Sequence, residues 1–261
     1  MRRAHSVGIM GVGWVGRAMQ KQFPSSAPFD PAIKEYSDGL ADVRKCSTVF
    51  VCVPTPCKNG GRLDTSEVFR AVKMCGTDAL FVLRSTLNPG DSDEIAQATG
   101  ARIVVQPEYL GETANHPMSD LTHRQWMIIG GHPNDRRELI DLYTTVCNAN
   151  VRIRQVSRLE AEVVKLSENR AIAFKLAQCQ ELYDVCEQAG IDYYTIRDAV
   201  YGDDPRFNLW WTFVSKNKRG FDSKCIPKDV FAWLAWAESF GGGLGSITKS
   251  ILTRNQAWTS K

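Results

Sequence analysis

Residues 5–23, HSVGIMGVGWVGRAMQKQF, decide the fold of this chain. The apolar run HSVGIM predicts a strand, and WVGRAMQKQF predicts a helix. A G-x-G-x-x-G motif at Gly11, Gly13 and Gly16 joins them, and this motif is weak evidence unless a strand and a helix flank it. In that setting the first glycine permits a tight turn, the second lets a pyrophosphate approach, and the third allows close packing of helix on strand. The stretch therefore predicts a dinucleotide-binding unit.

An acidic residue stands where such a unit binds ribose. Asp30 ends the second predicted strand, roughly 20 residues beyond Gly11. A carboxylate there would repel a 2′-phosphate, so it favours NAD over NADP. A glycine-rich turn without a ligand is the alternative, and the combination of strand, helix and acid weighs against it.

Two segments with different patterns of apolar and polar residues follow one another along the chain. Over residues 1–157, short apolar runs alternate with helical stretches, which predicts an α/β fold with a Rossmann-type parallel sheet covered on both faces. From Arg158 to about Gly190 there is one long helical pattern, with Gly190 as its expected cap. The remainder also reads as helices. We therefore expect a NAD-binding domain over 1–157 and a mainly α-helical domain over 158–261. The predicted strands are HSVGIMG, APFDP, TVFVCVP, ALFVLRST, RIVVQPEYL and QWMIIGG.

Composition narrows the function classes. The 261 residues are 43% hydrophobic and 23% charged, as is usual for a soluble globular protein. A net charge of +3 is too small to predict binding to nucleic acid or to a membrane surface. No run approaches the about 18 apolar residues that a membrane span requires. The eight cysteines lack zinc-site spacing, so we expect reduced thiols, a cytoplasmic location and no metal.

Two proline-containing segments follow predicted strands. VCVPTP (51–56) and RSTLNPG (84–90) lie at the strand ends, where open parallel sheets bind their ligands. Thr86 is the polar side chain of interest there. Each segment alone reads equally well as a proline-rich turn.

Further polar residues could take part in acid–base or oxyanion chemistry. QPEYLGE (106–112) places Glu108 and Glu112 directly after a strand, and Glu108 is a candidate general base if burial raises its pKa. A solvated acid at a helix start is the alternative. Lys165 and Asn169 are four residues apart on the long helix, so they share a face and could hold an oxyanion. An exposed polar face explains that spacing as well.

One cysteine has the surroundings of a nucleophile. Pro227 suits the first turn of the helix that continues as DVFAWLAWAESFG. Cys225 would then lie at a helix N-terminus beside Lys224 and Lys228, and all three influences would lower its thiol pKa. The other seven cysteines lie in apolar or helical contexts and are expected to serve packing.

As a set, these motifs resemble the UDP-glucose/GDP-mannose dehydrogenase family of nucleotide-sugar 6-dehydrogenases. The matching stretches run in family order over nearly the whole chain, and the last three are specific to the family. The resemblance implies an NAD-dependent, two-fold oxidation of a sugar C6 alcohol to a carboxylate through a cysteine thioester. The stretches are GVGWVG, VCVPTP followed by Gly61 and Asp64, RSTLNPG, QPEYLGE, KLSEN and GFDSKCIPKD.

The resemblance also implies a role for each candidate. Cys225 would capture the aldehyde and then carry the acyl group, and Glu108 would activate the hydrolytic water. Lys165 and Asn169 would stabilise the oxyanion.

The remaining implied roles complete the site. Asp229 would orient water or the lysine, Thr86 would help to position water, and Glu112 matches a second acid near the active site. The implied cofactor-binding residues are Gly11, Gly13, Trp14, Val15, Gly16, Asp30, Val53, Pro54, Thr55, Thr86 and Glu112. The implied substrate-binding residues are Glu108, Tyr109, Leu110, Lys165, Asn169, Phe221 and Cys225.

Two features depart from the family pattern. The family's GFGG-x-C loop reads GFDSKC here, so Asp222 and Ser223 replace glycines and Lys224 follows, which predicts altered sugar recognition. Family members also continue into a third domain that holds the nucleotide. This chain ends at SITKSILTRNQAWTSK, which predicts a short form without that domain.

Two other function classes stay open from the sequence. A non-catalytic NAD-binding homologue would explain the departures, although such a protein has no need of the catalytic set. A two-domain β-hydroxyacid dehydrogenase would transfer one hydride and need no cysteine. The long helix and the tryptophan-rich second half predict a homodimer, and the resemblance implies that the helical domain forms it.

Overall fold

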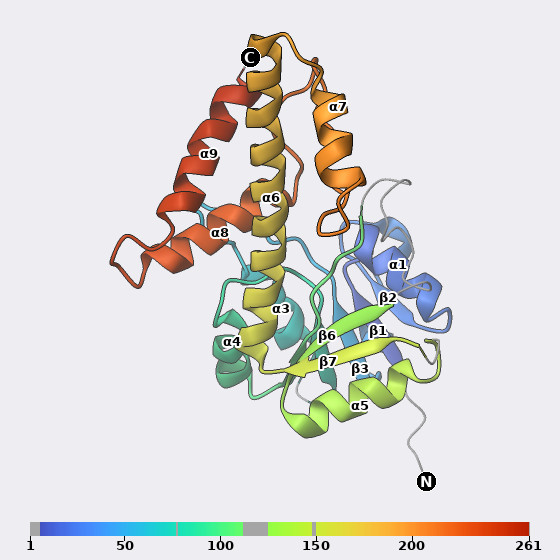
Figure 1. Ribbon diagram of the computed structural model, residues 1–261. Helices are drawn as coiled ribbons and strands as arrows, with labels where there is room; N and C mark the ends of the chain where they lie inside the picture. The colour runs from blue at the N-terminus through green and yellow to red at the C-terminus, as the bar shows by residue number, and fades with distance from the viewer. Residues whose placement is uncertain (1–5, 77, 112–124, 148–149, 261) are drawn as a thin grey trace. The chain divides into compact units, whose positions relative to one another are not determined.

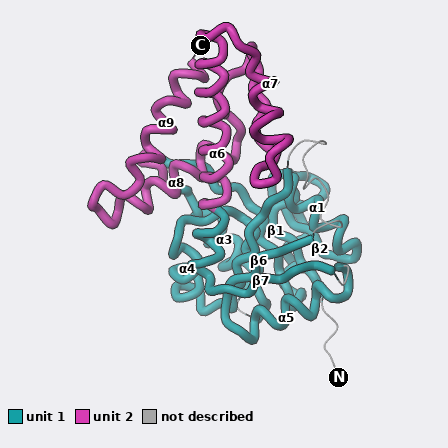
Figure 2. The backbone as a smooth tube through the Cα atoms, in the orientation of Figure 1, with its two compact units in different colours: residues 1–58, 63–165 teal, residues 59–62, 166–261 magenta. Residues whose placement is uncertain are grey.

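The computed structural model describes residues 6–76, 78–111, 125–147 and 150–260 (Figure 1). The chain divides into two compact units, unit 1 with residues 1–58 and 63–165 and unit 2 with residues 59–62 and 166–261 (Figure 2). The division falls inside helix α6 (Arg158–Ala189), whereas the sequence places the domain boundary at its first residue.

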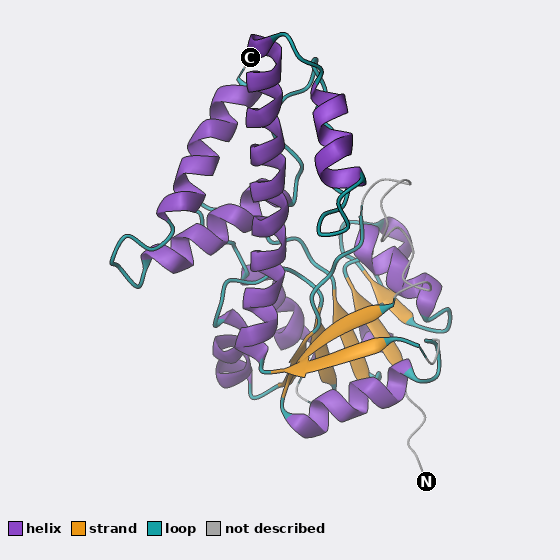
Figure 3. Ribbon diagram, viewed as in Figure 1, coloured by secondary structure: helices purple, strands orange, loops and turns teal. Residues whose placement is uncertain are grey.

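Unit 1 is built on a seven-stranded sheet in the order β2-β1-β3-β4-β5-β6-β7, drawn in orange in Figure 3. All neighbouring strands are parallel except β5 and β6, which are antiparallel. The predicted Rossmann-type sheet is therefore confirmed. The strands are β1 (Val7–Met10), β2 (Ala27–Phe29), β3 (Thr48–Val51), β4 (Leu80–Leu83), β5 (Arg102–Val105), β6 (Trp126–Gly131) and β7 (Arg152–Val156).

The helices of unit 1 cover both faces of this sheet, because side chains alternate along each strand. In β4, Phe81 and Leu83 pack against α2, α3, α4 and the first turns of α6, whereas Leu80 and Val82 pack against α1 and α5. Continuous apolar strands are typical of a sheet buried on both sides. The helices are α1 (Trp14–Gln22), α2 (Leu40–Val43), α3 (Ser66–Cys75), α4 (Asp91–Thr99) and α5 (Pro133–Tyr143).

Unit 2 is helical, as the sequence predicts. Besides the larger part of α6 it contains α7 (Tyr193–Arg197), a π-helical turn at Asp198–Gly202, α8 (Ile226–Glu238) and α9 (Ser246–Thr259). Gly190 ends α6 with a left-handed φ of 67°, which confirms the predicted cap. Among the helices of the described residues, none has the length and apolar character needed to cross a bilayer.

Candidate active site

The loops that carry the predicted motifs meet at one edge of the sheet in unit 1. Cys52 N donates to Met10 O (2.7 Å), Arg84 N to Val51 O (2.9 Å), and Gln106 N to Leu83 O (3.0 Å). Each bond joins the residue after one strand to the end of its neighbour. The carboxyl ends of β1, β3, β4 and β5 therefore form a continuous row, which is where ligands bind in open parallel sheets.

Of the three glycines in the glycine-rich loop, Gly13 alone has space for a side chain among the described atoms. Gly11 has a φ of 86°, and a Cβ on it would lie 2.8 Å from the carbonyl oxygen of Cys52. A Cβ on Gly16 would lie 2.0 Å from the carbonyl oxygen of Gly11. A Cβ on Gly13 would have none of the described atoms within 4 Å, so packing does not require glycine there. The open space at the start of α1 fits the pyrophosphate of a dinucleotide.

Asp30 directly follows β2 and is held beside this loop. Its Oδ2 accepts from Val12 N (2.8 Å), and its Oδ1 accepts from Ala32 N (2.9 Å). Each carboxylate oxygen has a further lone pair for a ribose hydroxyl. Trp14 and Val15 begin α1, and Trp14 is 53% exposed.

The loops after β3 and β4 are joined to each other. Ser85 Oγ donates to Val53 O (2.7 Å), beside the half-buried Thr86. Pro54 is exposed and Thr55 is buried. The sequence reasoning missed Ser85, because nothing in its local pattern separates it from the neighbouring hydroxyl.

Glu108 and Lys165 both contact Tyr109 in unit 1, Glu108 at its backbone and Lys165 at its ring. Glu108 Oε1 accepts from the backbone N–H of Tyr109 (2.7 Å) and of Leu110 (2.6 Å). Its other oxygen forms an ion pair with the fully buried Arg84, which the sequence reasoning did not single out. Lys165 Nζ lies 4.9 Å from the centre of the Tyr109 ring. The structure thus brings Lys165 next to Tyr109, the residue that follows Glu108.

Glu112, the second predicted acid of this loop, lies outside the described residues.

Unit 2 holds a second group of predicted site residues. Asn169 on α6 donates through Nδ2 to Asp229 Oδ2 on α8 (2.5 Å), and both side chains are buried. Lys228 Nζ lies 2.6 Å from Asp229 Oδ1 and balances its charge. Since an amide nitrogen carries two N–H groups, Asn169 can give the second one to another acceptor.

Cys225 is the N-cap residue of α8, with Pro227 in the first turn, which confirms the predicted position. Its carbonyl oxygen accepts from Asp229 N (3.1 Å), and its side chain is exposed. Ser223 Oγ accepts from Ile226 N (3.2 Å), so this departure from the family loop satisfies the first backbone N–H of α8.

The residues before the cysteine are anchored inside unit 2. Phe221 is buried, and its backbone exchanges two hydrogen bonds with the Asn255 side chain (2.8 and 2.9 Å). A Cβ on Gly220, whose φ is 72°, would lie 2.7 Å from Asn255 Oδ1. Asp222 and Lys224 are exposed.

The other cysteines differ from one another in burial and in thiol pKa. Burial raises the pKa of Cys52 to about 12 and that of Cys75 to about 11, so neither is a nucleophile at neutral pH. Cys57 is exposed, so its predicted role in packing is wrong. It lies in a proline-rich loop beyond the end of β3, and its neighbours Lys58 and Asn59 are polar.

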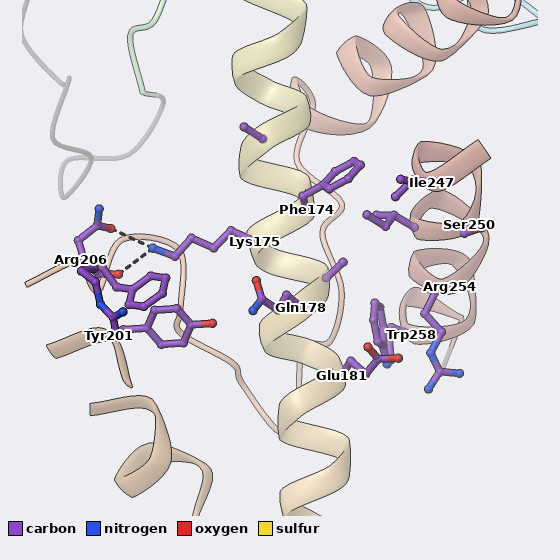
Figure 4. Close-up of a pocket in the computed structure, with 15 residues that line it drawn as sticks. Phe174, Lys175, Gln178, Glu181, Tyr201, Arg206, Ile247, Ser250, Arg254 and Trp258 are labelled. Carbon is purple, nitrogen blue, oxygen red and sulfur yellow. Dashed lines mark hydrogen bonds between the residues drawn. The ribbon is translucent and has the colours of Figure 1, made fainter. Parts of the chain in front are cut away.

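A pocket of about 750 Å³ lies on another part of unit 2 (Figure 4). Its lining comes from α6, α9 and residues 201–208, and it does not include the Cys225 group. Lys175 Nζ donates to Asn208 O (2.7 Å) and to Asn208 Oδ1 (2.9 Å) across one side of it. Phe207 and Ile247, both largely exposed, add apolar surface.

Comparison with known proteins gives matches over most of the chain. Residues 32–147 match the model of the UDP-glucose/GDP-mannose dehydrogenase family, NAD binding domain, and residues 159–257 match that family's central domain. UDP-glucose 6-dehydrogenase of Rickettsia typhi is 27% identical over 225 residues, which are 82% of this chain and 50% of the relative. The enzyme of the same name from Pseudomonas aeruginosa is 27% identical over 84% of this chain and 50% of its own. The chain thus spans about half the length of these relatives.

Solved structures share the fold. A UDP-glucose dehydrogenase from Pyrobaculum islandicum superposes with a TM-score of 0.81 at 23% identity, covering 98% of this chain and 69% of its own. The 3-hydroxyisobutyrate dehydrogenase of Mycobacterium tuberculosis has a TM-score of 0.71 at 18% identity, covering 97% of this chain and 94% of its own. At these identities the likeness concerns the fold alone.

Proposed function

This chain belongs to the UDP-glucose/GDP-mannose dehydrogenase family, and from that premise we propose that it oxidises the C6 alcohol of a nucleotide sugar to the carboxylate through a thioester on Cys225. The family's NAD-binding domain makes NAD the cofactor. The observation that carries the proposal is an exposed thiol at the start of α8, one turn before a buried carboxylate bonded to Asn169. The family matches do not favour the non-catalytic alternative.

The cofactor would bind at the carboxyl edge of the sheet. The N–H groups at the start of α1 would hold the pyrophosphate over Gly13, and Asp30 would accept from the ribose hydroxyls. Bound NAD would accept a hydride in each of the two oxidations. Further cofactor contacts are proposed for Trp14, Val15, Val53, Pro54, Thr55, Thr86 and Glu112.

The chemistry after the first oxidation would depend on the chain's own side chains. The Cys225 thiolate adds to the aldehyde carbon, and the resulting alkoxide is protonated to a thiohemiacetal. Loss of a hydride and a proton gives the thioester. Water then adds to the acyl carbon and the C–S bond breaks, which releases the carboxylate and restores the thiolate.

The supporting residues suit these steps. Glu108 would accept a proton from the water, with Thr86 helping to place it. Lys165 and the second N–H of Asn169 would stabilise the oxyanion. Asp229, fully buried, would keep the Asn169 amide oriented. Tyr109, Leu110 and Phe221 are proposed to line the sugar site.

The helical domain, residues 158–261, is proposed to form a homodimer. Support comes from a run of exposed apolar side chains over residues 207–213 in unit 2, including Phe213 at 68% exposure. Exposed apolar surface of this kind marks interaction sites. Sedimentation of the purified chain would give the oligomeric state, and a monomer at micromolar concentration would contradict the proposal.

A substrate screen tests the activity. The purified chain is incubated with UDP-glucose or GDP-mannose and either NAD or NADP, and reduced cofactor is measured by absorbance. We expect turnover with NAD and at least one nucleotide sugar, and at most weak turnover with NADP because of Asp30. Absence of reduced cofactor with every sugar at high enzyme concentration would refute the proposal. A β-hydroxyacid dehydrogenase would instead oxidise a small hydroxy acid.

A further inference from the structure

A carboxylate on α6 caps a different helix. Glu162 is 2% exposed, and both of its oxygens accept backbone hydrogen bonds. Oε2 accepts from Gly90 N (2.7 Å), and Oε1 accepts from Ser92 N (2.9 Å). Gly90 is the N-cap residue of α4 and Ser92 is its second residue, and Gly90 has no side chain to cap the helix. Glu162 therefore joins α6 to the end of the 84–90 loop, which carries Thr86.

The rest of this loop is fixed to unit 1 independently of α6. Asn88 Oδ1 accepts from Leu63 N (2.8 Å), and Asn88 Nδ2 donates to Leu63 O (3.0 Å). Asn88 Nδ2 also donates to Asp91 Oδ2 (2.7 Å). Ser85 Oγ donates to Val53 O in the loop after β3. The loop is thus a defined surface against which α6 can be set.

The first turns of α6 are seated tightly in unit 1. Ala161 is fully buried, and a Cβ on Gly130 of β6 would lie 2.6 Å from the Ala161 Cβ. Arg158 forms an ion pair with Asp93 of α4, but this pair is partly exposed, and such pairs contribute little. The buried bonds of Glu162 are therefore the stronger link between the helix and the loop.

Lys165 lies three residues beyond Glu162, on the same face of α6. We propose that Glu162 is a positioning residue, which holds the Thr86 loop and Lys165 in fixed register so that water and oxyanion are placed together. The inference rests on the proposed function, because it assigns these two residues to the reaction. Nothing in the local sequence distinguishes Glu162 from a solvated acid; the two backbone bonds reveal it. A misplacement of about 1 Å in such a site costs about 100-fold in rate.

The test is the Glu162→Gln variant, assayed as the whole chain with NAD and the sugar found in the screen. The substitution keeps the shape but turns an NH2 group toward one of the two backbone N–H groups, so one bond is lost. We expect kcat to fall about 10- to 100-fold while KM for NAD stays within about twofold. The matched control is Glu160→Gln on the same helix. Glu160 is exposed and accepts hydrogen bonds from Ser157 rather than from the 84–90 loop. The kcat of Glu160→Gln should therefore equal that of the wild type.

Glu162→Asp gives a second variant, which keeps the charge but is too short to reach both amides. Thermal unfolding is measured in parallel, and kcat is expressed per folded molecule. If the wild type is active and both Glu162 variants match Glu160→Gln in kcat per folded molecule, the inference about Glu162 is overturned and the proposed function stands. An equal rise of KM for NAD and fall of kcat would also overturn it, because this would indicate general loss of the fold. Absence of turnover by the wild type would overturn the proposed function and this inference with it.

Discussion

Replacing Asp229 by Asn would remove the charge at the centre of the buried group in unit 2. Asp229 is fully buried and accepts from Asn169 Nδ2 (2.5 Å) and from Lys228 Nζ (2.6 Å). An amide has one acceptor oxygen, so its NH2 group would face either the Asn169 amide or the Lys228 ammonium. One charge-assisted bond is lost in both cases.

The expected cost follows from these contacts. A hydrogen bond to a charged group contributes about 1.5 to 3 kcal/mol, and breaking a buried ion pair costs about 3 to 5 kcal/mol. Lys228 is partly exposed and can turn to water, which reduces the second penalty. We therefore expect Asp229→Asn to lower the free energy of unfolding by about 2 to 3 kcal/mol. At about 2 to 4 °C per kcal/mol, Tm should fall by about 4 to 12 °C.

Urea and thermal unfolding followed by circular dichroism measure this change without substrate. The control is Asp222→Asn, which removes an exposed carboxylate paired with Lys218 at 3.3 Å. Such surface pairs contribute little, so the control should lose less than about 1 kcal/mol. If Asp229→Asn is no less stable than the control, the reasoning about the buried group is refuted.

Three further predictions concern Cys225, the glycines of the glycine-rich loop, and Glu162. In a Cys57→Ser background, the rate at which iodoacetamide alkylates Cys225 should rise with pH and level off below about pH 8.5, which is the ordinary thiol pKa. A rate that still rises at about pH 8.5 would contradict the role of Cys225 as a nucleophile. Gly16→Ala should lower stability by about 1 to 3 kcal/mol, whereas Gly13→Ala should leave stability intact and weaken NAD binding, as calorimetry would show. Burial raises the pKa of Glu162 in the folded chain above the ordinary value of a glutamate. The protonated side chain therefore stabilises the fold at pH values below that ordinary pKa, and this stabilisation should be lost as the pH rises through the raised pKa. Urea unfolding measured over this pH range should show the loss for the wild type and not for Glu162→Gln.

Local sequence patterns were sufficient to predict most strands and helices and to place Cys225 at the start of a helix. The apolar runs predicted β1 to β6, and Pro227 predicted that Cys225 would begin a helix, because strand burial and helix starts are set by neighbouring residues. The pattern left out β7 and α4 and did not show that β6 is antiparallel to β5, since periodicity does not encode strand direction.

Contacts between distant residues could not be predicted in the same way. Arg84 beside Glu108, and Glu162 at the start of α4, join residues far apart in sequence. Residues 59–62 belong to unit 2 because Gly61 packs against the backbone of Phe231, which no local pattern indicates. The candidate site residues were therefore proposed from motifs, whereas the side chains that contact them became visible only in the fold.

The number of NADH molecules formed per carboxylate tests the central claim most directly. NADH absorbance and the carboxylate product are quantified together until the sugar is exhausted, for wild type and for Cys225→Ser. A covalent double oxidation predicts two NADH per carboxylate in the wild type and no carboxylate from the variant. One NADH per substrate, with the variant as active as the wild type, would contradict the account.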